Sequence, residues 1–146
     1  MSFTYPKNIW FVCSRCGLCC GDTPKKTRHV FLLKQEVKRI ADHTKQSVNS
    51  FAKEAPGNAP YLFEMRKNPD SLMCIFLKDN ACTIYDNRPL VCRFYPFELS
   101  TTDNGEFVFK ETNECPSLSC SELKNAKKLG FSFFASLFEL ACAELR

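Results

Sequence analysis

The sequence has little histidine and glycine. Its 146 residues include two histidines, His29 and His43, and five glycines. Neither histidine has the spacing of a metal ligand, so we expect both to have ordinary surface or packing roles. No glycine-rich phosphate loop, Ser-His-Asp set or cluster of paired carboxylates is visible. The residues therefore give no independent indication of catalysis, and enzyme activity stays open.

Long hydrophobic runs are also missing. The longest candidate, residues 129–143, is interrupted by Glu139 and is too short for a membrane span. Residues 1–6 have neither the basic nor the apolar segment of a secretory signal peptide. We therefore expect a cytoplasmic protein with no membrane partner, whose cysteines remain reduced instead of forming disulfides.

Cysteine, in contrast, is abundant, with ten residues in the chain. The first four are Cys13, Cys16, Cys19 and Cys20. A two-residue spacing between cysteines lets a tight turn bring two sulfurs to one metal ion, and here it occurs twice. Because Cys, Ser and Gly are poor helix formers, we expect a metal-wrapping loop. Cys19 and Cys20 would point to opposite faces of an extended chain, so one of them could serve a second site.

A second set of cysteines follows, at Cys74, Cys82, Cys92 and Cys115. Cys74 and Cys82 fit the two strands of a hairpin, and Cys115 precedes Pro116. The eight candidate ligands suffice for two tetrahedral sites or for one iron–sulfur cluster with spares. Their spacing does not decide how they divide. Cys142 is expected to be a core thiol, and Cys120 is left unassigned.

The spacing also bears on the metal. Zinc sites commonly use one Cys-x-x-Cys pair from each half of the site, and only the N-terminal half has such spacing here. Three close thiols with a remote Cys-Pro are nearer to cluster ligation. We therefore expect an iron–sulfur cluster or iron, with zinc as the alternative. The net charge of +4 counts thiols as neutral, so an anionic thiolate site would offset it and nucleic acid is not an expected partner.

Two arginines accompany the second set. Arg88 and Arg93 could bind the cofactor by donating hydrogen bonds to thiolate sulfur or by offsetting its charge. Alternatively, they cap turns or pair with Asp86 and Glu98. Both interpretations remain open. The basic stretch at residues 25–28 is expected to be a solvated loop.

The hydrophobic pattern predicts a small single α+β domain over residues 1–146. Its metal-ligating core would cover about 10–120 and a long C-terminal helix about 121–145, with Phe134, Leu137, Phe138 and Ala141 on the apolar face. An earlier helix would bury Val37 and Ile40 and expose Glu36 and Arg39. Short strands are expected at 9–12, 29–33, 61–66, 97–99 and 107–109, and a hairpin at 72–85.

The cysteine pattern resembles the CxxCxxCC, or YkgJ-type, cysteine-cluster family. The first four cysteines are followed by Cys82-x-Ile84-Tyr85-x-x-Arg88-Pro89-x-x-Cys92-Arg93-x-Tyr95-Pro96, and the resemblance covers about 10–120. It implies a zinc- or iron-chelating domain. Its ligands carry over onto Cys13, Cys16, Cys19, Cys20, Cys74, Cys82 and Cys92, and less closely onto Cys115.

Two alternative functions remain. Flagellin lysine N-methylases carry a similar motif, so a protein lysine N-methylase-like enzyme or accessory is one alternative. The other is a zinc-stapled interaction module that binds a protein partner through the C-terminal helix, where Phe131 and Phe133 extend the apolar surface.

Overall fold

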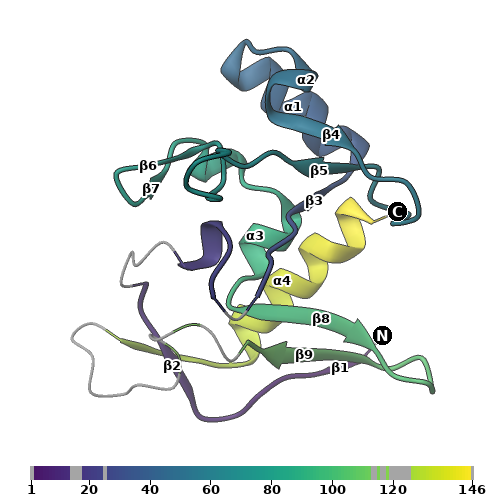
Figure 1. Ribbon diagram of the computed structural model, residues 1–146. Helices are drawn as coiled ribbons and strands as arrows, with labels where there is room; N and C mark the ends of the chain where they lie inside the picture. The colour runs from purple at the N-terminus through teal and green to yellow at the C-terminus, as the bar shows by residue number, and fades with distance from the viewer. Residues whose placement is uncertain are drawn as a thin grey trace. The chain divides into compact units, whose positions relative to one another are not determined.

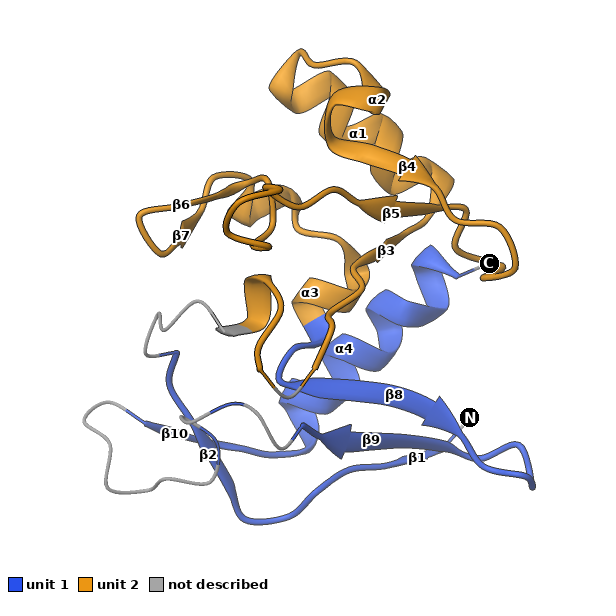
Figure 2. Ribbon diagram, in the orientation of Figure 1, with its two compact units in different colours: residues 1–14, 94–146 blue, residues 15–93 orange. Residues whose placement is uncertain are grey.

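The structure, a computed structural model, describes residues 2–13, 18–24, 26–112, 115, 118 and 126–145. The chain divides into two compact units (Figure 2): unit 1 is formed by residues 1–14 and 94–146, and unit 2 by residues 15–93. Short strands and helices occur in both, as the predicted α+β class requires. The single domain expected over the whole chain stays a prediction.

Unit 2 combines a small sheet, a hairpin and several helices (Figure 1). In chain order its elements are η1 (Leu18–Cys20), β3 (Phe31–Leu32), α1 (Lys34–Thr44), α2 (Val48–Phe51), β4 (Ala52–Glu54), β5 (Phe63–Met65), β6 (Leu77–Lys78), β7 (Ala81–Cys82), η2 (Tyr85–Asn87) and α3 (Leu90–Phe94). The sheet has the order β3-β5-β4 with antiparallel pairing, and β6 pairs with β7. The predicted hairpin is therefore present, with shorter strands than expected.

The hydrophobic core of unit 2 lies between α1, α2 and the β3-β5-β4 sheet and reaches the segment around the hairpin. Its buried members are Val30, Leu32, Val37, Ile40, Phe51, Ala52, Met65, Phe76 and Ile84. Val37 and Ile40 come from the predicted inner face of α1. Phe51 and Phe76 pack with ring centroids 5.6 Å apart. This core gives the cysteine-bearing segments a rigid apolar support.

Glu36 is buried, whereas the helical pattern predicted an exposed side chain. The residue is 0% exposed. Its Oε2 accepts a hydrogen bond from the backbone N–H of Leu33 at 2.8 Å, and its Oε1 accepts one from the N–H of Leu90 at 2.5 Å. A carboxylate is tolerated in an apolar core when its oxygens are hydrogen-bonded. Arg39, also predicted outside, is half-buried.

Unit 1 contains a three-stranded sheet, a two-stranded sheet and the C-terminal helix. Its elements are β1 (Phe3–Thr4), β2 (Ile9–Phe11), β8 (Phe97–Thr101), β9 (Phe107–Glu111), β10 (Lys127–Leu129) and α4 (Phe131–Glu144). The larger sheet has the order β1-β9-β8, in which β8 and β9 are antiparallel and β1 lies parallel to β9. The smaller sheet pairs β10 with β2, also antiparallel.

Aromatic side chains form the core of unit 1. Phe134 is 0% exposed, and its ring centroid lies 4.9 Å from that of Phe97 and 5.3 Å from that of Phe109. Phe138 packs against Phe3 and Phe107 at 5.0 and 5.2 Å. Each such pair contributes about 1 kcal/mol beyond the area that it buries. Together they attach α4 to the β1-β9-β8 sheet.

The predicted start of the C-terminal helix is wrong. Residues 127–129 form strand β10, and the helix begins at Phe131 after Gly130. Residues 121–125, where the predicted helix began, lie outside the described part of the chain. Pairing of β10 with β2 overrides the local helical pattern. The inner face of the helix was predicted correctly at Phe134, Phe138 and Ala141, which are buried.

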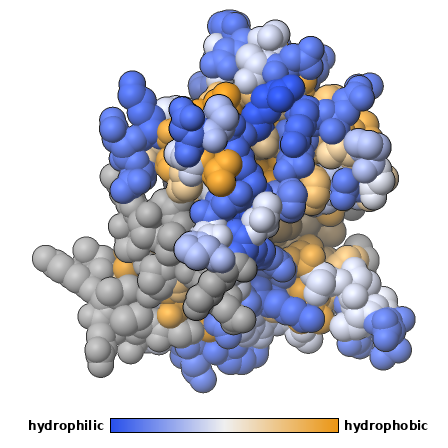
Figure 3. Space-filling model, viewed as in Figure 1, coloured by the Kyte–Doolittle hydropathy of each residue, from blue (hydrophilic) through white to orange (hydrophobic). Residues whose placement is uncertain are grey.

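The described surface in Figure 3 is largely hydrophilic, with smaller hydrophobic areas between the charged groups. No helix within the described ranges is long and apolar enough to span a membrane.

Candidate metal centre

Unit 2 contains six of the predicted ligands, and five of them lie in its described part, on four separate segments. Cys19 and Cys20 end η1, Cys74 lies before β6, Cys82 is in β7 and Cys92 is in α3. All five are free thiols. The fold therefore gathers cysteines that are up to 73 positions apart in the sequence into one unit.

Cys19 and Cys20 form the closest pair. Their Sγ atoms are 3.7 Å apart. Two thiolates bound to one tetrahedral zinc ion, with bonds of about 2.3 Å, stand about 3.8 Å apart. The pair thus has the separation of two ligands on one ion. The sequence-based expectation that the two side chains diverge assumed an extended chain, but η1 is a 3₁₀ turn that lets both sulfurs approach each other.

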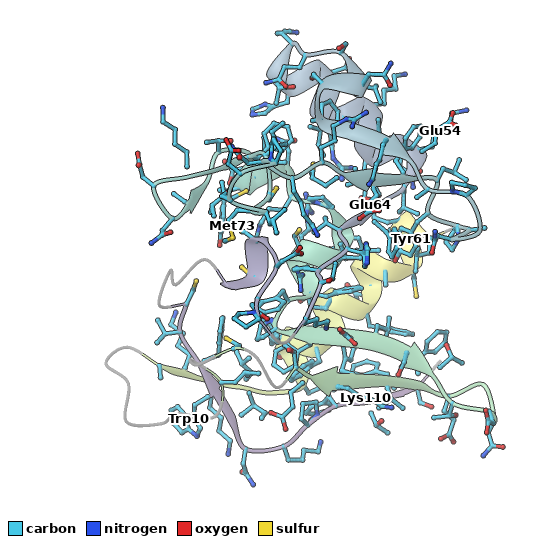
Figure 4. All side chains as sticks on the ribbon, in the orientation of Figure 1. Trp10, Glu54, Tyr61, Glu64, Met73 and Lys110 are labelled. Atoms are coloured by element: carbon cyan, nitrogen blue, oxygen red, sulfur yellow. The ribbon has the colours of Figure 1, made fainter. Side chains whose placement is uncertain are left out.

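Gly21 brings Cys74 close to this pair. Gly21 forms an antiparallel bridge with Met73, and the backbone N–H of Cys74 donates to the carbonyl of Cys20. A Cβ atom on Gly21 would lie 2.5 Å from Met73 Sδ and 2.7 Å from the Leu72 carbonyl oxygen. Only glycine permits so close an approach. In Figure 4, Met73 lies beside η1 with several sulfur atoms near it.

Asp22, the residue after Gly21, links two nearby loops through hydrogen bonds. Its Oδ1 accepts hydrogen bonds from Lys67 Nζ at 2.5 Å and from the backbone N–H of Arg28 at 2.9 Å. These bonds, that of Lys67 foremost, lower the pKa of the Asp22 carboxyl. Lys67 in turn forms a backbone bridge with Cys74. Asp22 therefore links the segment that ends at Arg28 to the segment that carries Cys74.

Hydrogen bonding and charge set the ionisation of the close pair. The hydrogen bond with Cys20 lowers the pKa of Cys19 to about 6, against the opposing effect of burial. The charges of Arg28 and Arg88 lower it further. The same hydrogen bond, followed by burial, raises the pKa of Cys20. The pair therefore favours one thiolate, on Cys19, that accepts the S–H of Cys20.

The other three thiols lie against the apolar core of unit 2. Cys74, Cys82 and Cys92 are half-buried and pack on that core. Burial raises the pKa of all three, that of Cys92 to about 12. Charge on Cys74 and Cys82 contributes to the shift at Cys92, so the three thiols are close enough to act on one another. Without a metal they are protonated at neutral pH.

Arg88 and Arg93 differ in what they contact. The Arg88 guanidinium lies over the Tyr85 ring, 3.9 Å from its centroid, and its charge lowers the pKa of both Cys19 and Cys82. Arg93 donates from Nε to the Arg88 carbonyl at 2.9 Å and from a terminal nitrogen to the Asp86 carbonyl at 3.4 Å. Arg88 Nε also donates to the Tyr85 carbonyl at 2.9 Å, so both arginines hold this turn, and the charge of Arg88 in addition favours thiolate at Cys19 and Cys82.

The remaining predicted ligands are placed as follows. Cys13 is exposed and Cys115 is half-buried, and both belong to unit 1. Cys16, like the unassigned Cys120, falls outside the described residues. Cys142 is half-buried on α4. Among the residues that the structure describes, no three Cys, His, Asp or Glu side chains gather closely enough to hold one metal ion.

The two histidines have different surroundings. His29 Nδ1 lies 2.7 Å from Glu64 Oε2, and the imidazole stacks on Phe31. His43 is an exposed residue in the last turn of α1.

A small open pocket adjoins two of the cysteines. It has a volume of about 210 Å³, including solvent at its mouth. Its lining residues are Cys20, Gly21, Arg28, Val30, Met65, Arg66, Lys67 and Cys74. Cys20 and Cys74 are therefore reachable from this pocket, beside basic side chains.

Sequence reasoning missed two residues that the structure connects to the centre. Arg28 belongs to a basic stretch that predicted a solvated loop, yet it is half-buried and its charge lowers the pKa of Cys19 and Cys92. No local pattern distinguishes it. Glu36 did carry a signal, because it stands three residues after the N-cap Leu33, where glutamate commonly reaches back to the N-cap backbone.

Comparisons with known proteins agree with the cysteine arrangement. The model of the CxxCxxCC family, described as "Putative zinc- or iron-chelating domain", matches residues 12–124. An uncharacterized protein of Methanocaldococcus jannaschii is 31% identical over 110 residues, covering 71% of this chain and 53% of that protein. This chain thus spans about half the length of that curated relative. No solved structure matches this chain. The family match covers most of the chain and includes the thiols of unit 2, so the chain belongs to the CxxCxxCC family.

Proposed function

We propose that this protein binds iron through the cysteine thiolates of unit 2, as an iron–sulfur cluster, with zinc as the competing metal. Membership of the CxxCxxCC family supports metal chelation. The observation that carries the assignment to particular residues is the 3.7 Å separation of the Cys19 and Cys20 sulfurs. Iron and zinc both accept tetrahedral sulfur ligands, so this separation suits either metal.

The distribution of the other thiols favours a cluster over a single ion. Cys74, Cys82 and Cys92 come from three further segments, and no third donor joins the close pair at single-ion distance among the described residues. Nevertheless, charge on Cys74 and Cys82 would raise the pKa of Cys92. A group with more than one iron spans more space than one ion and can take thiolates from several segments. Cys16, which also belongs to unit 2, is a further proposed ligand, and Cys13 and Cys115 of unit 1 stay ligands predicted from the sequence.

The surrounding residues fit an anionic thiolate centre. The positive charges of Arg28 and Arg88 lower the pKa of Cys19, which supports a thiolate there. The apolar core behind Cys74, Cys82 and Cys92 excludes water on that side. A bound cluster would supply one-electron redox chemistry, and zinc would supply a structural cross-link. In both cases the chain contributes ligands, compensating positive charge and an apolar surface that excludes water.

The experiment is purification under anaerobic conditions with iron and sulfide supplied, followed by metal analysis, sulfide analysis and an absorption spectrum. We expect bound iron, acid-labile sulfide and broad visible absorption together. Cys19→Ser should lose most of the iron, and Cys142→Ala, a matched thiol on α4, should keep it. Colourless protein with stoichiometric zinc and no sulfide would show that the bound metal is zinc and not iron. Protein that binds neither metal would refute it.

One observation favours a second candidate, the zinc-stapled interaction module. On α4 the Phe131 side chain is 61% exposed and that of Phe133 is 36% exposed, although the Phe131 ring stacks on Phe3. Exposed aromatic rings are common at protein interfaces. The metal analysis separates the two candidates, because a dimeric, zinc-containing and sulfide-free protein would favour the module.

A further inference from the structure

We propose that Glu36 is a positioning residue of the cysteine centre: it fixes where Cys92 lies by anchoring the first residue of α3. The inference rests on the proposed function, in which Cys92 is a metal ligand. Glu36 itself lies on α1 and contacts backbone groups at the starts of two helices.

The geometry of Glu36 leaves its carboxylate little freedom. The residue is 0% exposed. Oε2 is held by the Leu33 N–H at the start of its own helix, at 2.8 Å, which fixes the plane of the carboxylate. Oε1 must then accept the Leu90 N–H in one direction, at 2.5 Å. The position of Leu90 relative to α1 therefore follows from the position of Glu36.

Helix α3 depends on this outside anchor. It has five residues, too few for a stable isolated helix, and its first N–H groups need acceptors. Pro89, which precedes it, has no polar side-chain atom that could act as a cap. The acceptor for Leu90 is supplied by Glu36, 54 positions away. Pro89 and Leu90 are themselves fully buried, so α3 starts at a point fixed by packing and by one carboxylate.

Cys92 lies two residues after this fixed point. Its backbone N–H donates to the Pro89 carbonyl at 3.0 Å, within the first turn of α3. A shift of Leu90 would therefore move the Cys92 sulfur relative to Cys74 and Cys82, the thiols whose charge it experiences. Outer groups that orient a ligand typically change metal affinity by about 10- to 100-fold when they are altered.

The alternative is that Glu36 only ties α1 to α3 and matters for stability alone. A double-mutant cycle distinguishes the two roles. Zinc affinity is measured by competition with a chromophoric chelator for wild type, Glu36→Gln, Cys92→Ser and the double variant. Glutamine keeps the size of the side chain but turns an NH₂ group towards one of the two N–H donors.

If Glu36 acts through Cys92, Glu36→Gln should lower zinc affinity about tenfold in the wild-type background and less than about twofold when Cys92 is absent. In the zinc-loaded Glu36→Gln protein, alkylation should accelerate at Cys92 and not at Cys19. The matched control is Glu64→Gln. Glu64 is half-buried on β5 of the same unit, paired with His29 and Lys53, and its replacement should leave zinc affinity unchanged.

Three results would overturn the inference. The first is an equal loss of affinity in both backgrounds, which would show a structural role only. The second is a Cys92→Ser protein that binds zinc as tightly as wild type. The third is failure of both Glu36→Gln and Glu36→Asp to fold with zinc present, because positioning would then not be separable from folding. Wild-type protein that binds neither zinc nor iron would instead refute the proposed function.

Discussion

Gly21 decides how closely η1 approaches the segment that carries Cys74. The backbone of Leu72 and Met73 occupies the space where any other residue would place its Cβ atom. Neither backbone segment can yield as a flexible side chain could, because Asp22 N–H donates to the Leu72 carbonyl and Cys74 N–H donates to the Cys20 carbonyl. Because Gly21 has no side chain, the segments that carry Cys20 and Cys74 can lie close enough to be hydrogen-bonded to each other.

We predict that Gly21→Ala destabilises the metal-loaded protein by about 2 kcal/mol, as overpacking typically does, and accelerates metal release. The reason is that Met73 and Leu72 must move away, taking Cys74 from Cys20. Urea unfolding and metal transfer to a chelator measure the two effects. Gly130→Ala is the control, because nothing lies within 4 Å of the point where its new methyl group would stand. Equal unfolding curves for Gly21→Ala and wild type would contradict the prediction.

The residues of the site differ in how far the sequence predicts them. Thiol chemistry and spacing predict Cys19, Cys20 and Cys74 as ligands without a structure. The 3.7 Å contact between Cys19 and Cys20 depends on the η1 turn and was not predicted. The burial of Glu36 was missed because its second hydrogen-bond donor, Leu90, is distant in the sequence.

The β6–β7 hairpin presents Cys82 through a two-residue turn. Lys78 pairs with Ala81, so Asp79 and Asn80 form the loop, with positive φ values of 52° and 59°. These values belong to a type I′ turn, which matches the twist of the flanking strands. Asparagine and aspartate tolerate this conformation better than most residues, and glycine adopts it without strain.

We predict that Asn80→Gly stabilises the protein by about 0.5 kcal/mol, because Asp-Gly is a preferred sequence for such a turn. Metal content should not change, since the thiol of Cys82 keeps its place. Thermal unfolding of the metal-loaded protein is the measurement. Asn80→Val is the opposing variant and should destabilise, because a β-branched residue is strained at positive φ. A lower melting temperature for Asn80→Gly would show that the Asn80 side chain itself is needed.

Among the elements, local patterns were predicted and distant pairings were not. Alternation and turn residues located β8, β9 and the β6–β7 hairpin, and helical periodicity located α1. Strand β10 was missed because its partner, β2, lies more than a hundred residues earlier in the chain. The parallel pairing of β1 with β9 was not predicted for the same reason. Such contacts depend on the whole fold, so a short sequence window does not contain them.

For the whole protein we predict that metal affinity rises with pH. The pKa values of Cys74, Cys82 and Cys92 are raised, that of Cys92 to about 12, so these thiols carry protons at neutral pH. Binding as thiolates must release those protons, so acid weakens binding and alkali strengthens it. Cys19, with a pKa of about 6, is already largely ionised above pH 7 and adds little slope there.

We therefore expect zinc affinity to increase about tenfold or more for each pH unit between pH 7 and 8. Chelator competition at several pH values measures the slope, and proton release into weakly buffered solution gives an independent count. The range begins at pH 7 so that ionisation of Cys19 contributes little. An affinity independent of pH would show that the bound groups are not these protonated thiols.

The division of the chain into two units also determines which unit is completed first during synthesis. Unit 2 is one continuous stretch, residues 15–93, whereas unit 1 joins residues 1–14 to residues 94–146. Because chains emerge from the N-terminus and fold as units, a ribosome has made all of unit 2, with its six cysteines, before it begins β9 or α4. Strand β1 must wait for β9, where Phe3 pairs with Phe107. The growing chain therefore completes unit 2 early, and the pairing of β1 with β9 in unit 1 forms afterwards.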